Sequence, residues 1–183
     1  MSAARRLFAE HGYHGTTIEA IANEAAVAVQ TVYFSFGSKA AILSRLVASG
    51  GADPAIRRLA ERAMAEAEPR RRLELGTRVI SMIMDRDRDI VDLMAQAGTG
   101  NPELVDAWRQ SHRQQVGRMS QLLQPIAEQG HLRPGMSHAE AVDVLLAVAS
   151  PEVHRLLTKE RKWSEARYRA WLARSAADLL LAG

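Results

Sequence analysis

Apolar residues recur at helical spacing along almost the whole chain, and this pattern restricts the fold strongly. No segment alternates apolar and polar residues with period two for long enough to predict a strand. The six prolines and twelve glycines are expected to separate helices. The sequence therefore predicts an all-α fold.

Length and composition limit the class of protein further. The 183 residues suit one ordinary domain or two small ones. The absence of cysteine excludes disulfides, thiolate zinc sites and a cysteine nucleophile. The sequence has no signal-like N-terminus and no apolar run of about 18 residues, so we expect a soluble, cytoplasmic protein with no membrane partner. The net charge of +3 is too small to indicate nucleic-acid binding by itself.

The N-terminal part is predicted to contain four short helices, over about 2–11, 17–25, 29–34 and 39–49. Gly12 lies where a left-handed residue commonly ends a helix. Thr16 and Glu19 have the spacing of a capping box, which predicts that Thr16 caps the second helix. Ser38 is expected to cap the fourth helix.

Longer helices are predicted in the remainder, over about 53–67, 70–84, 88–97, 103–129, 137–149 and 164–181. Ser137 is expected to cap a helix, and Ser150 followed by Pro151 predicts a new helix or a kink. The charged run 85–89 is expected to be a solvated turn. We place a domain boundary at Gly50 and Gly51.

Three short helices within about 35 residues, with a short turn between the second and third, have helix-turn-helix geometry. Residues 3–43 resemble the TetR family of bacterial regulators. The matching segments are AARRLFAEHGY (3–13), TTIEAIA (16–22) and VAVQTVYFSFGSK (27–39). The resemblance implies that residues 1–49 form a DNA-binding domain and residues 50–183 a ligand-binding and dimerisation domain. It also implies a homodimeric repressor that binds a palindromic operator in double-stranded DNA and is released by a small-molecule effector.

The resemblance, together with the chemistry of the side chains, identifies candidate DNA contacts. Thr17 lies at a helix N-terminus, where phosphate is favoured, and Tyr33 and Lys39 are further candidate phosphate contacts. Phe34, beside Tyr33, is included in the same surface. Each of these residues could instead serve only the fold of the domain.

Base reading is expected from the start of the third helix. The Gln30 amide can pair with adenine in a bidentate manner, and the methyl groups of Val29 and Thr31 can meet a thymine methyl. Among the positions that depart from the family pattern, two lie in the turn before the third helix. Ala26 stands where glycine is usual in the turn, and Ala28 replaces a serine that would cap the third helix.

A candidate effector site follows from the long helix that is predicted after residue 102. Its apolar stripe includes Trp108 and Met119 and is interrupted by His112 and Gln115. Two polar groups on such a face either bond within the core or line a cavity, and both alternatives stay open. Flexible methionines on preceding segments, Met82 and Met94, would suit a hydrophobic ligand, although methionine is also common core filler.

The last two long helices have broad apolar faces, and the resemblance places the dimer interface there. The alternative is that both faces close the core of one chain. No catalytic, metal or cofactor motif is recognisable, so we expect no enzyme, no metal and no cofactor. Two competing functions remain: a protein of the same fold that binds a small molecule but no DNA, and, with less support, a helical-bundle enzyme.

Overall fold

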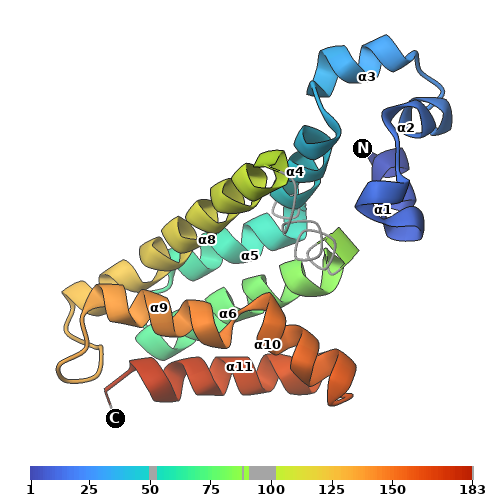
Figure 1. Cartoon of the computed structure of the whole chain (residues 1–183). Coiled ribbons are helices and arrows are strands. Elements are labelled where there is room, and N and C mark those ends of the chain that lie inside the picture. The colour runs from blue at the N-terminus through green and yellow to red at the C-terminus, as the bar shows by residue number, and fades with distance from the viewer. Residues whose placement is uncertain (50–52, 88, 91–101, 183) are drawn as a thin grey trace. The chain divides into compact units, whose positions relative to one another are not determined.

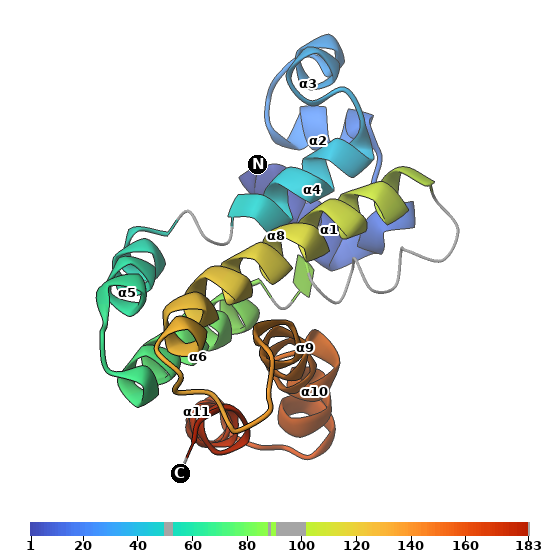
Figure 2. The same ribbon diagram turned by 90° about the vertical axis from the view of Figure 1, so that its left-hand side faces the viewer.

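The computed structural model describes residues 1–49, 53–87, 89–90 and 102–182. Every regular element in these ranges is a helix, apart from one isolated bridge between Leu132 and Leu181, and the all-α prediction is confirmed (Figures 1 and 2). The chain divides into two compact units. Unit 1 comprises Met1–Gly50 and Asp87–Arg113, and unit 2 comprises Gly51–Arg86 and Gln114–Gly183.

Unit 1 contains the short N-terminal helices, which are α1 (Ser2–Gly15), α2 (Ile18–Glu24), α3 (Val29–Phe36) and α4 (Lys39–Ser49). Gly12 has the predicted left-handed conformation, with φ 70°, and kinks α1 there. Ser38 accepts from the Ala41 amide and caps α4 as expected. A single apolar core joins α1, α2, α3 and α4, and Ile90 is fully buried in it although it lies far along the chain. Unit 1 therefore includes a segment that the sequence assigned to the second domain.

Unit 2 contains α5 (Pro54–Ala65), α6 (Pro69–Arg86), α9 (His138–Val148), α10 (Pro151–Arg155), the π-helix η2 (Leu156–Glu160) and α11 (Glu165–Leu180). Helix α8 (Pro102–Glu128) begins in unit 1 and ends in unit 2. In unit 2, α11 lies against both α6 and α9 (Figures 1 and 2). The expected caps Ser137 and Ser150 are present, and Ser137 forms a full capping box with Glu140.

We expected glycine and proline to lie between helices, but some of them lie inside helices. Pro125 lies inside α8 and Gly76 inside α6. A Cβ atom placed on Gly76 would be 2.3 Å from Leu122 Cδ2. Gly76 therefore lets α6 approach α8 closely, at the cost of a weaker helix.

The broad apolar faces of α9 and α11 close the core of unit 2. Eight of their residues are buried in it, namely Ala141, Val142, Leu145, Tyr168, Leu172, Ala176, Ala177 and Leu180. The alternative that these faces serve the core of one chain is thus correct for these positions. In the described part of the chain, no helix has both the length and the apolar character needed to cross a membrane.

Candidate nucleic-acid interface

The turn between α2 and α3 keeps a helix-turn-helix conformation without its usual glycine. Ala26 adopts φ 52°, and the Val27 amide donates to the Ala22 carbonyl oxygen at 3.0 Å. An L-residue in the left-handed region costs about 1–2 kcal/mol, which the turn must offset elsewhere. Ala28 is the N-cap of α3 and makes no side-chain capping bond, as expected from the loss of serine.

One face of α3 is held in the core, and the other faces solvent. Val32 is buried, and Val29 packs partly against the same core. Gln30 and Thr31 are exposed. Phe34, one helical turn after Gln30, is 95% exposed, an unusual state for a phenylalanine. These positions form a surface of two polar groups beside an aromatic ring, which suits the edges of bases in a major groove.

Thr17, and not Thr16, caps α2. The Thr17 hydroxyl accepts from the Ala20 amide at 3.1 Å and is the N-cap of α2. Thr16 is buried, with its hydroxyl 2.8 Å from the Gly12 carbonyl oxygen and 3.1 Å from that of Leu7. The predicted capping box with Thr16 was therefore wrong, because the kink at Gly12 leaves carbonyl groups that the Thr16 hydroxyl satisfies. Thr17 remains exposed, and its own hydroxyl proton can be donated to a phosphate.

Lys39 stabilises the junction of α1 and α2 through hydrogen bonds. Its ammonium donates to the carbonyl oxygens of Tyr13 and Thr16, each at 2.7 Å, and lies 4.3 Å from the centre of the Tyr13 ring. Burial lowers the pKa of the Lys39 ammonium from its ordinary value. Because an ammonium has three donors, one N–H remains for a phosphate. Tyr33, 48% exposed, offers a phenol on the same unit.

Comparison with known proteins agrees with this geometry. Residues 1–46 match the family of bacterial regulatory proteins, tetR family. Over 154 residues, the chain is 23% identical to the HTH-type transcriptional regulator UidR of Escherichia coli K12, with 80% of this chain and 74% of that protein covered. The helix-turn-helix segment, residues 1–46, is a TetR-family domain. The chain is thus a DNA-binding transcriptional regulator of the helix-turn-helix class.

Solved structures of two transcriptional regulators share the whole fold. FadR from Bacillus subtilis, in complex with stearoyl-CoA, has a TM-score of 0.78 at 20% identity, with 97% of this chain and 96% of that one covered. NalD from Pseudomonas aeruginosa, the secondary repressor of the MexAB-OprM multidrug efflux pump, has a TM-score of 0.74 at 23% identity, with 98% and 92% covered. The similarity extends well beyond the helix-turn-helix segment.

The six residues predicted to line an effector site have different surroundings. In unit 2, Met119 is buried, while Met82 and Gln115 are partly buried. In unit 1, Trp108 is 49% exposed and stacks on the exposed His112, with ring centroids 5.2 Å apart. The stripe of α8 is therefore not uniformly directed inward. Met94 lies outside the described residues.

A groove of about 480 Å³ occurs elsewhere in unit 2 and contains none of these six residues. It is open to solvent and is lined by Arg133, Pro134, Gly135, Met136, Glu140, Asp143 and Val144. The effector site thus stays a prediction.

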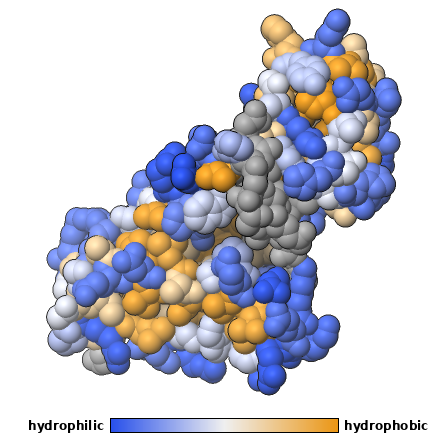
Figure 3. Space-filling model, in the orientation of Figure 1, coloured by the Kyte–Doolittle hydropathy of each residue, from blue (hydrophilic) through white to orange (hydrophobic). Residues whose placement is uncertain are grey.

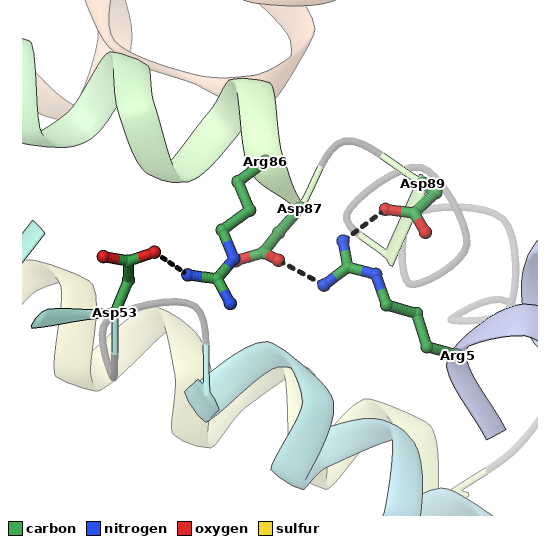
Figure 4. A network of polar contacts seen from close by, with 5 residues as sticks. All are labelled: Arg5, Asp53, Arg86, Asp87 and Asp89. Atoms are coloured by element: carbon green, nitrogen blue, oxygen red, sulfur yellow. Dashed lines mark hydrogen bonds and ion pairs between the residues drawn. The ribbon is translucent and has the colours of Figure 1, made fainter. Parts of the chain in front are cut away.

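Sequence reasoning missed an ion-pair cluster in unit 1. Arg5 on α1 binds Asp87 through Nη1 and Asp89 through Nη2, and each of these nitrogens lies 2.8 Å from a carboxylate oxygen (Figure 4). The Asp87 side chain is only 3% exposed. The expectation of a solvated turn was therefore wrong for Asp87. The side chains of residues 85–89 alternate between negative and positive charge. This pattern does not show whether a given carboxylate is solvated or binds an arginine that is distant in the sequence.

Proposed function

We propose that this TetR-family chain is a repressor that binds a palindromic operator as a homodimer and is released by a small hydrophobic ligand. The exposed face of α3 carries this proposal. Gln30, Thr31 and the almost fully exposed Phe34 have few contacts within the chain, and their chemistry matches base edges and thymine methyl groups. Thr17, Tyr33 and the third donor of Lys39 would hold phosphates and set the register.

A homodimer would use the sides of α9 and α11 that do not close the core. On α11, Trp171, Ser175 and Leu179 follow one another at intervals of four residues and are partly or fully exposed. Val144 and Val148 on α9 are partly buried beside the same core. Figure 3 shows apolar surface over this part of unit 2. Two copies joined there would present two α3 helices, as reading of half-sites about 34–36 Å apart requires.

A hydrophobic effector is supported by α6 and by one relative. Val79, Ile80, Met82 and Ile83 on α6 are all partly buried, which leaves apolar surface accessible along this helix. Methionine adapts to guests of different shape. The structurally similar FadR from Bacillus subtilis binds stearoyl-CoA, and a long acyl chain is a reasonable first class of ligand to test here.

Selection from random double-stranded DNA on the full-length protein tests this function. We expect a palindrome to be enriched and to bind the dimer with an affinity that falls steeply with salt. A panel of acyl-CoA thioesters of increasing chain length is then titrated against the complex, and release by long-chain members is expected. Enrichment of no sequence by a folded dimer would contradict operator binding. Release by no member of the panel would contradict the acyl class alone.

A TetR-fold protein that binds a ligand but no DNA is the second candidate. The strained Ala26 and the uncapped α3 favour it, because both weaken the helix-turn-helix segment. The salt dependence of DNA binding distinguishes the two functions. Phosphate contacts give a steep slope, whereas a protein that does not bind DNA gives no saturable signal.

A further inference from the structure

Helices α6 and α11 pack against each other within unit 2, and their contact includes a buried hydroxyl group (Figures 1 and 2). Tyr168 of α11 has no exposed surface, and its hydroxyl donates to the Met84 sulfur of α6 at 3.9 Å. A buried tyrosine hydroxyl usually has a hydrogen-bond partner, but a thioether sulfur is a weak acceptor. The Tyr168 hydroxyl is therefore poorly satisfied within the chain.

Two further hydroxyl groups lie on the face of α6 that carries Met84. Thr77 and Ser81 precede Met84 by seven and three residues, a spacing that places all three on one face of the helix, and both are buried. The Thr77 hydroxyl donates to the Leu73 carbonyl oxygen at 2.8 Å, and the Ser81 hydroxyl donates to that of Thr77 at 2.9 Å. Both hydroxyls thus bond locally, within their own helix.

A second donor on α11 is buried without an acceptor. Arg169 follows Tyr168, and its Nε atom is buried with no hydrogen-bond partner among the described residues. A guanidinium group can only donate, so an oxygen or nitrogen acceptor is what would satisfy it. Two consecutive residues of α11 therefore carry buried donors, one with a weak acceptor and one Nε with none. This arrangement favours a ligand that supplies an acceptor oxygen.

The surroundings of Tyr168 favour an uncharged acceptor. Burial raises the pKa of the Tyr168 phenol, and the Glu165 carboxylate raises it further, so the phenol keeps its proton and acts as a donor. The same carboxylate disfavours an anionic oxygen beside the phenol. His154 packs edge-on against the Tyr168 ring, with ring centroids 4.7 Å apart, and its Nε2 lies 3.2 Å from Glu165 Oε2. These contacts hold the ring in place.

We propose that Tyr168 binds the carbonyl oxygen of a hydrophobic effector, in the position that the Met84 sulfur occupies in this structure. The inference rests on the proposed function, because it names the group that recognises the polar end of that effector. Met84 is unbranched and flexible, so its side chain can yield this position to a guest. Met82 and Ile83 beside it on α6 are partly buried and give an apolar chain access from the surface. Arg169 Nε supplies a second donor.

Infrared spectroscopy of heptyl methyl ketone bound to the full chain tests the contact. This probe has one acceptor oxygen on an apolar chain, and an isotope label on its carbonyl carbon separates its band from those of the protein. A hydrogen bond moves that band to lower wavenumber. With Tyr168→Phe we expect the band to return toward its position in hexane, and the affinity to fall by about two- to tenfold, the range of one hydrogen bond.

Met84→Leu is the second variant, because it removes the competing sulfur at similar volume. We expect it to tighten binding of the ketone by about twofold or more, as the phenol then has no acceptor of its own. A merely structural contact between Tyr168 and Met84 predicts the opposite, a loss of binding in both variants. If Tyr168→Phe does not fold, the affinity of Met84→Leu alone decides the result.

Tyr13→Phe is the matched control, since it removes a phenol from unit 1, and it should change neither the band nor the affinity. The inference is overturned if the wild type does not bind the ketone, if its band is the same in Tyr168→Phe, or if Met84→Leu weakens binding. Release of DNA by an acyl-CoA thioester without dependence on Tyr168 would overturn it too, while supporting the proposed function. Failure of DNA selection would contradict the proposed function and leave the infrared result unchanged.

Discussion

Arg72 donates from its Nε to the main-chain oxygen of Leu122 at 2.7 Å and thereby joins α6 to α8 inside unit 2. The same guanidinium donates to the carbonyl oxygens of Met64 and Glu66, each at 2.8 Å, at the end of α5. Arg72 is buried, and this burial lowers its pKa from the ordinary value. Three helices thus depend on one cation that bonds to carbonyl groups.

Replacing Arg72 by methionine should destabilise unit 2 by about 2–4 kcal/mol, because three carbonyl oxygens lose a charged donor. Urea unfolding followed by circular dichroism measures the loss. Arg71→Met is the matched control, since Arg71 is exposed and its pair with Glu74 lies at the surface, and it should change stability far less than Arg72→Met. Equal effects of the two substitutions would contradict the structural role of Arg72.

Ala26→Gly should stabilise unit 1 by about 0.5–1 kcal/mol, because the relief of left-handed strain exceeds the entropy that glycine adds to the unfolded chain. Its neighbour Ala25 has φ −84° and provides the control. Ala25→Gly relieves no strain and should destabilise by a similar amount. Thermal unfolding of both variants measures the difference. A lower melting temperature for Ala26→Gly would show that Ala26 is not strained.

Lys39→Met should lower both the stability of unit 1 and the salt dependence of DNA binding. The stability falls because the carbonyl oxygens of Tyr13 and Thr16 lose their donor, at a cost of about 1–3 kcal/mol. The slope of log K against log salt should fall by about one if the third N–H holds a phosphate. Unfolding and DNA titration at two salt concentrations measure the two effects. Loss of stability with an unchanged slope would limit Lys39 to a structural role.

Acid should weaken the N-terminus of α9. Bonds from the Ser137 amide and hydroxyl lower the pKa of Glu140 below its ordinary value of 4.5. Because the folded-state pKa is the lower one, the contribution is complete above the ordinary value and is lost as the pH falls through the folded-state pKa. Exchange of the first α9 amides between about pH 6 and pH 3 follows this loss. Glu140→Gln should remove the acid dependence, and an unchanged profile in that variant would refute the assignment.

Sequence reasoning predicted local features well where a single residue type determines them. Gly12, Ser38, Ser137 and Ser150 have the conformations or caps expected from their positions. It failed by one residue at the start of α2, where Thr16 and Thr17 are both threonines. Only the carbonyl groups left by the kink in α1 decide which one is buried.

Contacts between distant segments were not predictable from local pattern. The run 85–89 gives no indication that Asp87 binds an arginine 82 residues earlier, or that Ile90 completes the core of unit 1. Likewise, the periodicity of α8 predicted one apolar stripe, but Trp108 and His112 lie in the portion assigned to unit 1 and are exposed. Helical periodicity identifies a face, and the tertiary fold decides whether that face is covered along its whole length.

The central claim is that α3 reads the sequence of bases in DNA. The most direct test is to titrate the selected duplex with the wild-type protein and with the variants Gln30→Ala and Arg58→Gln. Arg58 is an exposed cation on α5 and serves as the control for a simple change of surface. We expect saturable binding by the wild type, a loss of about 1–3 kcal/mol with Gln30→Ala, and no significant change with Arg58→Gln. Equal affinities of the wild type and Gln30→Ala, or no saturable binding by a folded dimer, would contradict the claim.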